Sequence, residues 1–317
     1  MTIKTYIYAF LLISPSLFLI ACGGGGGGTD NTAPTATEQK GQFIDSLVSG
    51  LRYETPTTSG VTDTQGRFSY RDGETIRFYV GDVFIGKASG RAIITPIELV
   101  NNANDESNVH VQNILIFLQS IDEDGDESNG ITITTNATNA ATGQSADFSL
   151  AKGVFETNAA VQTLISTIRN SNGQTRPMIT RAQAKNAFRS NLLNLFSGKY
   201  KGTFTGDDTG SWIATVDANG VITGISTSDA YGADKISGTL SSSGKSSMSG
   251  TAGSTIFSGN FSRTGNVTGT WVDDTNASGS FTGKRISATS AAANNNTRTS
   301  SKESGSNASN ITVAGNY

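Results

Sequence analysis

An acidic stretch, DEDGDESNG at residues 122–130, carries the side chains of this sequence that are best suited to chemistry. Five carboxylates crowd into six residues there, namely Asp122, Glu123, Asp124, Asp126 and Glu127. They follow a predicted helix that ends at Ile121, and a helix C-terminus already carries roughly half a negative charge, so each anion costs up to about 1 kcal/mol. A bound cation would remove that penalty. The alternative is a solvated acidic turn in which salt screens the repulsion.

The D-x-D-G-D spacing of Asp122, Asp124 and Asp126 resembles the first half of dockerin and EF-hand calcium loops. Positions 1, 3 and 5 of those loops supply oxygen ligands. The resemblance therefore implies Ca²⁺ as a cofactor, with Asp122, Asp124 and Asp126 as ligands. The second half departs from the pattern, because Ile133 stands where a bidentate acid is expected at position 12.

Catalytic constellations are scarce in this sequence. The chain has one histidine, His110, so an H-E-x-x-H metalloprotease site is excluded, and we find no G-x-S-x-G nucleophile motif. We predict that His110 is a structural residue with satisfied partners at the start of a buried helix. We therefore predict no catalytic residue. A carboxylate-based glycoside hydrolase stays open as the less favoured alternative, because a list of residues does not exclude it, although the sequence nominates no two carboxylates that would line a cleft.

The single cysteine, Cys22, lies between an apolar segment and six glycines. Residues 6–20 are apolar except for Ser14, Pro15 and Ser16, and Lys4 precedes them. Such a stretch has the length of a signal peptide and is too short for a comfortable membrane span. Residues 1–21 are therefore predicted to be a signal peptide.

The run Leu19-Ile20-Ala21-Cys22 resembles the bacterial lipobox. The resemblance implies that Cys22 becomes a diacylglyceryl cysteine, that the chain is cut before it, and that a fatty acid such as palmitate acylates the new amine. Several acyl chains on one residue meet the requirement of more than one lipid for stable anchoring. The alternative is an ordinary secretory signal with an incidental cysteine, which would have no disulfide partner in this chain.

Residues 22–40 are predicted to be a lipidated cysteine followed by a glycine-rich tether. If residues 23–40 form a flexible coil, their ends lie on the order of 25 Å apart. Position 23, directly after the cysteine, is Gly rather than Asp. The lack of Asp at this position resembles the signal by which Gram-negative lipoproteins are exported to the outer membrane. We therefore expect a protein anchored in the cell outer membrane, facing either the periplasm or the cell surface.

Composition limits the classes of partner. The chain of 317 residues has 37 Gly, 5 Pro, 15% charged residues and a net charge of −3. A slightly acidic chain without a basic run argues against nucleic acid as a partner. Abundant glycine with few charges favours a fold of short strands and turns.

Residues 41–100 are predicted to form a small antiparallel β module, because short alternating runs are separated by Gly and Asp turn signals. Within it, residues 59–70, where the turn TDTQG leads into the strand RFSY, resemble the carboxypeptidase-regulatory-like or Cna-B-like sandwich repeat. That resemblance implies a spacer or presentation module without catalysis. The unit is short for a full sandwich, so we expect it to borrow strands or to pack on the helices that follow.

Residues 101–197 are predicted to be a helical connector of about three helices. Residues 109–121 are apolar nearly all round, which predicts a buried helix, and residues 156–169 form an amphipathic pattern. A third helix should begin after Thr180, because Gln183 completes a T-x-x-Q capping box.

Residues 198–286 are predicted to form an eight-stranded antiparallel meander, a sheet that curls or closes into a barrel. Its runs are 200–204, 211–216, 221–226, 235–240, 246–251, 255–261, 267–272 and 278–285. Alternation points five aromatic side chains inward, namely Phe204, Trp212, Phe261, Trp271 and Phe281. The pattern resembles the barrels of Gram-negative surface lipoproteins, including transferrin-binding-protein-like ones. Residues 287–317 lack apolar periodicity, and we expect a disordered tail.

Together these features predict a mainly β lipoprotein with a helical connector and a C-terminal barrel. The expected function is non-catalytic binding, adhesion or presentation at the cell surface, with the membrane as one partner through the lipid and an unidentified protein or glycan as the other. The alternative is a periplasm-facing structural or accessory lipoprotein of the outer membrane.

Overall fold

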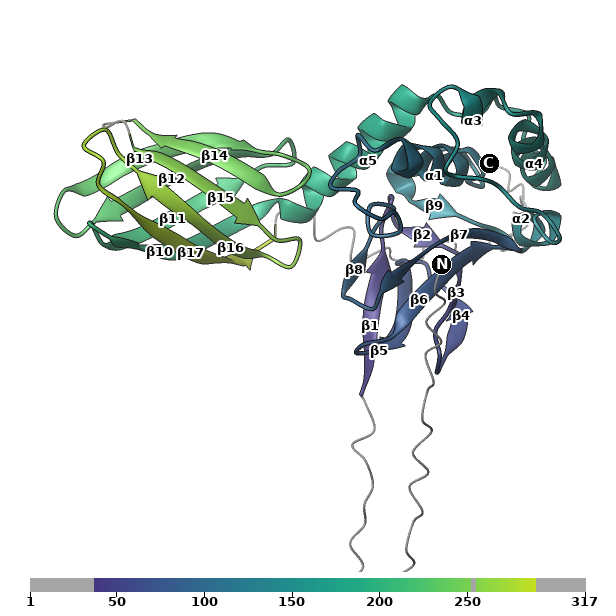
Figure 1. Cartoon of the computed structure of the whole chain (residues 1–317), viewed down its shortest axis with the longest axis horizontal. Helices are drawn as coiled ribbons and strands as arrows, with labels where there is room; N and C mark the ends of the chain where they lie inside the picture. The colour runs from purple at the N-terminus through teal and green to yellow at the C-terminus, as the bar shows by residue number, and fades with distance from the viewer. Residues whose placement is uncertain (1–36, 252–254, 289–317) are drawn as a thin grey trace, which may run out of the picture. The chain divides into compact units, whose positions relative to one another are not determined.

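The computed structural model describes residues 37–251 and 255–288 of the chain (Figure 1). This part is mainly β, with five α-helices and a closed eight-stranded antiparallel barrel, so the predicted fold class is confirmed. Its buried apolar side chains form two clusters, one shared by the N-terminal strands and the helices and one inside the barrel. The predictions for the signal peptide, Cys22 and most of the tether and tail lie outside the described residues.

Small sheets form the N-terminal part. The first has the order β5-β1-β8, from β1 (Glu38–Phe43), β5 (Arg67–Arg71) and β8 (Ile93–Ile94). The second has the order β4-β3-β6-β7, from β3 (Arg52–Glu54), β4 (Ser59–Val61), β6 (Thr75–Val80) and β7 (Val83–Ser89). The third pairs β2 (Val48–Ser49) in parallel with β9 (Ile131–Thr132).

Aromatic side chains join the first two sheets. Along β6, Ile76, Phe78 and Val80 are buried and alternate with more exposed residues, as expected for a strand with one covered face. The ring of Phe78 lies 4.8 Å from that of Phe43 on β1 and 5.4 Å from that of Phe68 on β5. These contacts form the centre of a small sandwich.

The β module packs on the helices, as its short length led us to expect. Strand β9 follows the first helix in the chain, yet Val48 of β2 pairs with Ile131 of β9. One buried cluster includes side chains of both the strands and the helices. The predicted boundary between residues 100 and 101 stays a prediction.

Helix α1 (Val109–Ser120) confirms the predicted buried helix, since every residue from Val111 to Ser120 is buried. It begins where the side chain of Asn108 accepts hydrogen bonds from the backbone N–H groups of His110 and Val111, at 2.9 and 3.3 Å. The other helices are α2 (Thr135–Ala140), α3 (Val154–Thr157), α4 (Ala159–Ser171) and α5 (Arg181–Phe196).

Two of the helix boundaries follow from caps. The predicted helix over residues 156–169 is wrong in its start, because Asn158 ends α3 and caps α4, accepting hydrogen bonds from the backbone N–H groups of Ala160 and Val161. Helix α5 has the predicted capping box, in which Thr180 Oγ1 accepts from the Gln183 N–H and Gln183 Oε1 accepts from the Thr180 N–H.

The barrel closes because its last strand pairs with its first. The strands are β10 (Gly198–Gly206), β11 (Gly210–Val216), β12 (Val221–Ser228), β13 (Gly232–Leu240), β14 (Lys245–Gly250), β15 (Ile256–Phe261), β16 (Asn266–Val272) and β17 (Ser278–Ser287). Each pairs antiparallel with the next, and β17 pairs with β10. All eight predicted strand runs correspond to strands of the barrel.

Aromatic side chains fill the barrel interior. The five predicted inward residues are confirmed, with exposed fractions from 2% to 6%, and they form edge-on ring pairs such as Phe204 with Trp271 and Trp212 with Phe281. Gly202 and Gly283 make room for the indole of Trp212, since a Cβ at either position would lie within 2.6 Å of it. The outer wall carries mainly Ser, Thr and Lys, with exposed apolar side chains such as Ile213 and Ile225 among them.

Helix α5 runs into the barrel through a single intervening residue, Ser197. Phe196, the last residue of α5, belongs to the buried cluster of the barrel. The hydroxyl of Tyr200, itself fully buried, donates to the carbonyl oxygen of Phe196 at 2.6 Å. Phe196 therefore covers one end of the barrel core.

Candidate functional site

The acidic stretch forms a tight loop between α1 and β9, with a short 3₁₀ helix, η1 (Glu127–Asn129), inside it. Asp122 is 1% exposed. Its Oδ2 accepts from the Gly125 N–H at 2.9 Å, and its Oδ1 accepts from the Thr132 N–H at 2.8 Å. Asp122 thus fastens the start of the loop to β9.

The other two predicted ligands, Asp124 and Asp126, are exposed and stabilise the local turn. Asp124 accepts from the Asp126 N–H and from the Asn129 side chain, both at 2.9 Å. Asp126 accepts from the Ser128 N–H at 3.1 Å and from the Ser128 hydroxyl at 2.5 Å. Their carboxylates keep free lone pairs, since each oxygen can accept more than one hydrogen bond.

Charge repulsion is present in this loop. Burial raises the pKa of Asp122 to about 6, and the neighbouring carboxylate of Asp124 adds to the rise, against the two backbone hydrogen bonds. Burial would also raise the pKa of Asp124, but its hydrogen bonds and Arg176 hold that pKa below the usual value. The two carboxylates therefore repel each other at neutral pH, where a group with a pKa of about 6 is mainly ionised.

Arg176 is a neighbour that the sequence analysis missed. Its Nη2 donates to the carbonyl oxygens of Ser120, at 3.4 Å, and of Asp122, and the guanidinium lies against Gly125. A cation on the last carbonyls of a helix offsets the negative end of its dipole. Part of the repulsion that we expected after α1 is therefore already compensated.

A second acidic residue, Asp45, reaches the same region from the two-residue turn between β1 and β2. It is fully buried, and its Oδ1 accepts from Gln119 Nε2 of α1 at 2.8 Å. Burial raises the pKa of Asp45 well above its usual range, and the carboxylates of Glu127 and Asp122 raise it further. Nothing in the local sequence around Asp45 indicates this proximity, because Gln119 lies far along the chain.

Ile133, at the position of the twelfth residue of an EF-hand loop, is 4% exposed and part of the core. It supplies no ligand. Within residues 37–251 and 255–288, no three side chains of His, Cys, Asp or Glu converge closely enough to form a ready metal site. A cation here would need amide or carbonyl oxygens, or water, beside the carboxylates.

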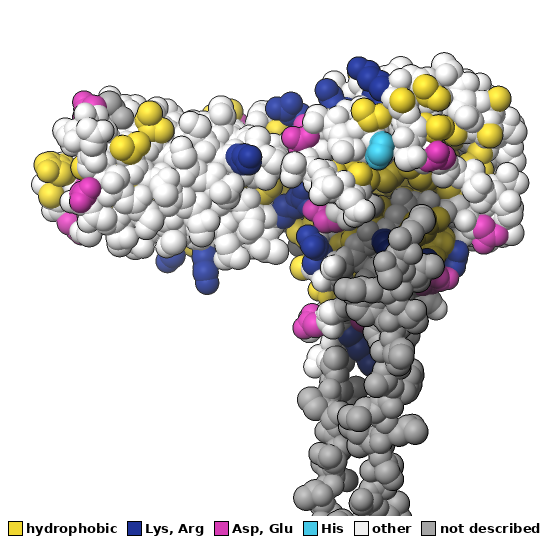
Figure 2. All heavy atoms as spheres, in the orientation of Figure 1, with side chains coloured by type: hydrophobic (Ala, Val, Ile, Leu, Met, Phe, Trp, Pro, Cys, Tyr) yellow, Lys and Arg dark blue, Asp and Glu magenta, His cyan; other side chains and the backbone are white. Residues whose placement is uncertain are grey.

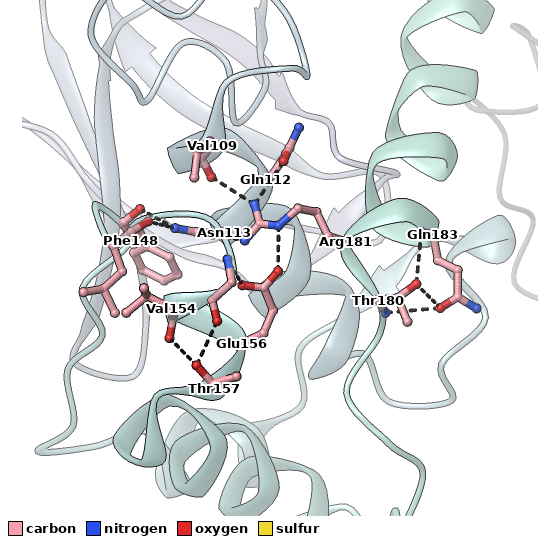
Figure 3. A network of polar contacts seen from close by, with 12 residues as sticks. Val109, Gln112, Asn113, Phe148, Val154, Glu156, Thr157, Thr180, Arg181 and Gln183 are labelled. Atoms are coloured by element: carbon pink, nitrogen blue, oxygen red, sulfur yellow. Dashed lines mark hydrogen bonds and ion pairs between the residues drawn. The ribbon is translucent and has the colours of Figure 1, made fainter.

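A polar network around Arg181 holds α1, α3 and α5 together (Figure 3). Its Nε donates to Glu156 at 2.6 Å, Nη1 to Gln112 at 3.0 Å and Nη2 to Asn113 at 2.6 Å. Asn113 in turn donates to the carbonyl oxygen of Phe148. The hydrogen bond from Arg181 holds the pKa of Glu156 below its usual value. Because the polar side chains of this network use one another and nearby carbonyl oxygens as hydrogen-bond partners, its role is structural.

The prediction for His110 is wrong, because its side chain is exposed rather than packed into the helical core (Figure 2). The backbone N–H of His110 is used by the Asn108 cap. Position 110 lies in the first turn of α1, before the buried stretch that begins at Val111.

A groove of about 550 Å³ lies on the outer wall of the barrel, over β17, β10, β11 and β12. Lys201 of β10 pairs with Lys284 of β17 and with Ile213 of β11, and Ile213 pairs with Ile225 of β12. Ile213 is 50% exposed and Ile225 45%. The groove therefore presents apolar side chains beside two cations.

No protein-family model matches the chain, and no curated protein matches it. Among the described helices, none has both the length and the apolar character that crossing a membrane requires.

Proposed function

We propose that this protein is a lipid-anchored lipoprotein of the cell outer membrane that acts as a non-catalytic module for binding, adhesion or presentation. The observation that carries the proposal is the position of Cys22, the single thiol of the chain, directly after Leu19-Ile20-Ala21 and before six glycines. A thiol at that point suits lipidation, and the glycines suit a tether that holds folded parts away from a membrane surface.

The barrel supports a binding or spacer role rather than catalysis in its interior. Aromatic rings occupy the inside, whereas Ser, Thr and Lys cover much of the outer wall. A partner, whether a protein or a glycan, would therefore contact the outer wall or the turns. Locally hydrogen-bonded turns, such as Asp217 bonded to the N–H groups of Asn219 and Val221, suit a module that stands in water.

Lipidation is tested with a Cys22→Ala variant and a palmitate analogue fed to cells that express the full chain. The wild type should carry label and should run as a cleaved, membrane-bound protein. Cys22→Ala should remain an uncleaved or mis-sorted precursor without label. The matched control is Ser16→Ala, which lies in the same leader and should be labelled like the wild type. Equal labelling of Cys22→Ala and wild type contradicts the proposal.

Surface exposure separates the binding role from the periplasm-facing alternative. Trypsin added to intact cells should cleave a surface protein at exposed loop residues such as Lys152, in the turn before α3. A periplasmic protein in the same cells must stay intact as the control. If this chain also stays intact until the outer membrane is permeabilised, it faces the periplasm, and the adhesion role is wrong.

A further inference from the structure

The outer wall of the barrel carries charge of one sign. The charged side chains that point outward from its described strands are all lysines, namely Lys199, Lys201, Lys235, Lys245 and Lys284. The acids of the barrel lie mostly in its turns, as Asp217 and Asp273 do. Asp234, the acid within β13, shares the inward side of that strand with Ile236. The wall is therefore positive although the whole chain has a net charge of −3, and it is complementary to an anionic ligand.

Two of these lysines stand directly opposite each other. Lys201 of β10 pairs with Lys284 of β17, and side chains at opposite positions of antiparallel strands have Cβ atoms about 4.5 to 5.5 Å apart. Like charges at such positions are destabilising. Among the described residues, neither lysine forms an ion pair with an acid. An anion between the two ammonium groups would replace this repulsion with attraction.

The same row of the barrel wall continues with apolar side chains. Lys201 also pairs with Ile213 of β11, and Ile213 pairs with Ile225 of β12. Ile225 in turn pairs with Lys235 of β13. Because neighbouring strands lie about 4.8 Å apart, the row places two half-exposed isoleucines between cations at both ends. A ligand that lies across these strands would meet charge, then an apolar surface, then charge again.

The groove of about 550 Å³ over β17, β10, β11 and β12 includes most of this row and adds hydroxyl groups to it. Sites for small molecules have volumes of roughly 300 to 1,000 Å³, so the groove is large enough for one. Its described lining contains no acid. Four of its side chains carry hydroxyls and are exposed, namely Thr203, Ser211, Thr227 and Thr282. The groove thus combines ammonium groups, hydroxyls and an apolar surface.

We infer that this groove binds an acidic glycan, with a carboxylate or a sulfate of the glycan between Lys201 and Lys284. The ammonium groups donate charge-assisted hydrogen bonds to the anion. The hydroxyls of the groove bond the hydroxyls of the sugar, because each can both donate and accept. Ile213 and Ile225 pack against the C–H face of a sugar ring. The inference rests on the proposed binding role and names the class of ligand for it.

An acidic peptide is the competing ligand. Peptides that bind a β-sheet commonly add a strand to a free edge, and main-chain hydrogen bonds then give the affinity. The barrel has no free edge, because β17 pairs with β10 and closes it. A peptide would therefore reach the groove with its side chains alone. A glycan presents hydroxyls along its whole length, which the four hydroxyls of the groove match.

The test is isothermal titration calorimetry of the full chain in a neutral detergent with two acidic sugars, trigalacturonate and a sulfated galactose trimer. The controls are the methyl ester of trigalacturonate and the unsulfated trimer, which keep the rings and lose the charge. We expect at least one acidic sugar to bind, and its neutral counterpart to bind at least about 10-fold more weakly. Added salt should weaken the binding of the acidic sugar.

Triglutamate has the carboxylates without the sugar hydroxyls, and it should bind at least about 10-fold more weakly than the acidic sugar. If neither acidic sugar binds, or if triglutamate binds equally well, the inference is overturned. Either result removes the glycan and leaves the lipid anchor untouched, because the anchor is tested separately by labelling of Cys22.

Two variants locate the anion. Lys201→Gln and Lys284→Gln should each weaken binding of the acidic sugar about 5-fold, the upper value for an exposed ion pair. Both side chains are exposed, so these variants should fold and should keep the melting temperature of the wild type. The matched control is Lys245→Gln on β14, an outward lysine outside the groove, whose affinity should be unchanged. Equal effects of all three variants would show attraction to the overall charge alone and would overturn the site.

The variant Ile213→Thr separates a sugar seated in the groove from an anion held by charge alone. Threonine is also β-branched and favours a strand, and both lysines stay in place. We expect the affinity for the acidic sugar to fall about 4-fold, the effect of about one buried methylene group. The dependence of binding on salt should stay that of the wild type. Unchanged affinity in Ile213→Thr would overturn the role of the groove.

Discussion

Replacing Arg181 with methionine should destabilise the N-terminal part of this protein. The side chain of Arg181 is 11% exposed, and that of its partner Glu156 is 23% exposed. The guanidinium also donates to Gln112 and Asn113. Methionine keeps most of the length of the side chain but removes the charge and all the donors, so three acceptors lose their partner in a mostly buried place.

Removing one partner of a buried ion pair costs about 3 to 5 kcal/mol, because the remaining charge is left without compensation. Glu156 keeps the backbone N–H of Gly153 at 3.1 Å and some contact with solvent. The expected loss for Arg181→Met is therefore near the lower end, about 3 kcal/mol. The free energy of unfolding falls by roughly 1 to 3 kcal/mol per molar of urea, so the urea concentration at the unfolding midpoint should fall by roughly 1 to 3 M.

Two optical signals separate the parts of the chain in this assay. Both tryptophans, Trp212 and Trp271, lie in the barrel, so tryptophan fluorescence follows the barrel. Circular dichroism at 222 nm follows the helices, and only this signal should shift in Arg181→Met. The control is Arg189→Met on the same helix, where the side chain is 55% exposed and 3.8 Å from Glu106. The carboxylate of Glu106 is buried but keeps the hydroxyl of Ser242 as a donor at 2.6 Å, so the loss should be smaller than in Arg181→Met. Equal midpoints for the two variants would refute the reasoning.

The same network predicts a pH dependence. The hydrogen bond from Arg181 lowers the pKa of Glu156 in the folded state. A lowered acid pKa gives a stabilisation that is present above the unfolded value of 4.5 and is lost as pH falls through the folded value. The difference in unfolding free energy between wild type and Arg181→Met should therefore shrink in acid, as measured by urea unfolding at pH 7 and at pH 3.5. A difference that stays constant or grows would contradict this assignment.

Three further predictions concern other parts of the chain. The fragment 198–286 should fold alone, because its strands pair with sequence neighbours and close on themselves, and a cooperative melt with a β-type dichroism spectrum is the check. Gly202→Ala should lower the urea midpoint seen by tryptophan fluorescence, because its Cβ would lie 1.9 Å from the carbonyl oxygen of Thr282 and 2.6 Å from Trp212 Nε1. Gly23→Asp should retain the lipoprotein in the inner membrane, which fractionation on a sucrose gradient would detect.

The barrel could be predicted from the sequence because its signals are local. Each strand is bounded by its own turn, and alternation along a strand tells which side faces inward, as Phe204 and Trp271 illustrate. Closure of the barrel has no such local signal, because the pairing of β17 with β10 depends on how twist accumulates over all eight strands. The glycine-rich pattern suggested sharp bending, and Gly202 under the indole of Trp212 gives one reason for it.

Helix boundaries were predicted where the cap is unambiguous and missed where one residue has two roles. Thr180 and Gln183 form a reciprocal box that can be identified from the sequence. Asn158 both ends α3 and begins α4, and the apolar pattern runs across it, so periodicity alone joins the two helices. His110 was predicted to be structural because its helix is apolar, although a residue in the first turn can still face solvent.

The candidate site was only half visible in the sequence. The spacing of Asp122, Asp124 and Asp126 singles out the loop without help from the fold. Asp45 has no such signal, because the turn that carries it meets the end of α1 only after the strands and helices have packed. Arg176 was hidden for the same reason, since its contact with the carbonyl oxygen of Ser120 spans a long stretch of chain.

The central claim, a lipid-anchored protein, is tested most directly by mass spectrometry of the N-terminal peptide of the mature protein isolated from membranes. The account predicts a chain that begins at Cys22, with a diacylglyceryl group on its sulfur and a fatty acid on its amine. A mature chain that begins at another residue, or one in which Cys22 carries a free thiol, would contradict the account.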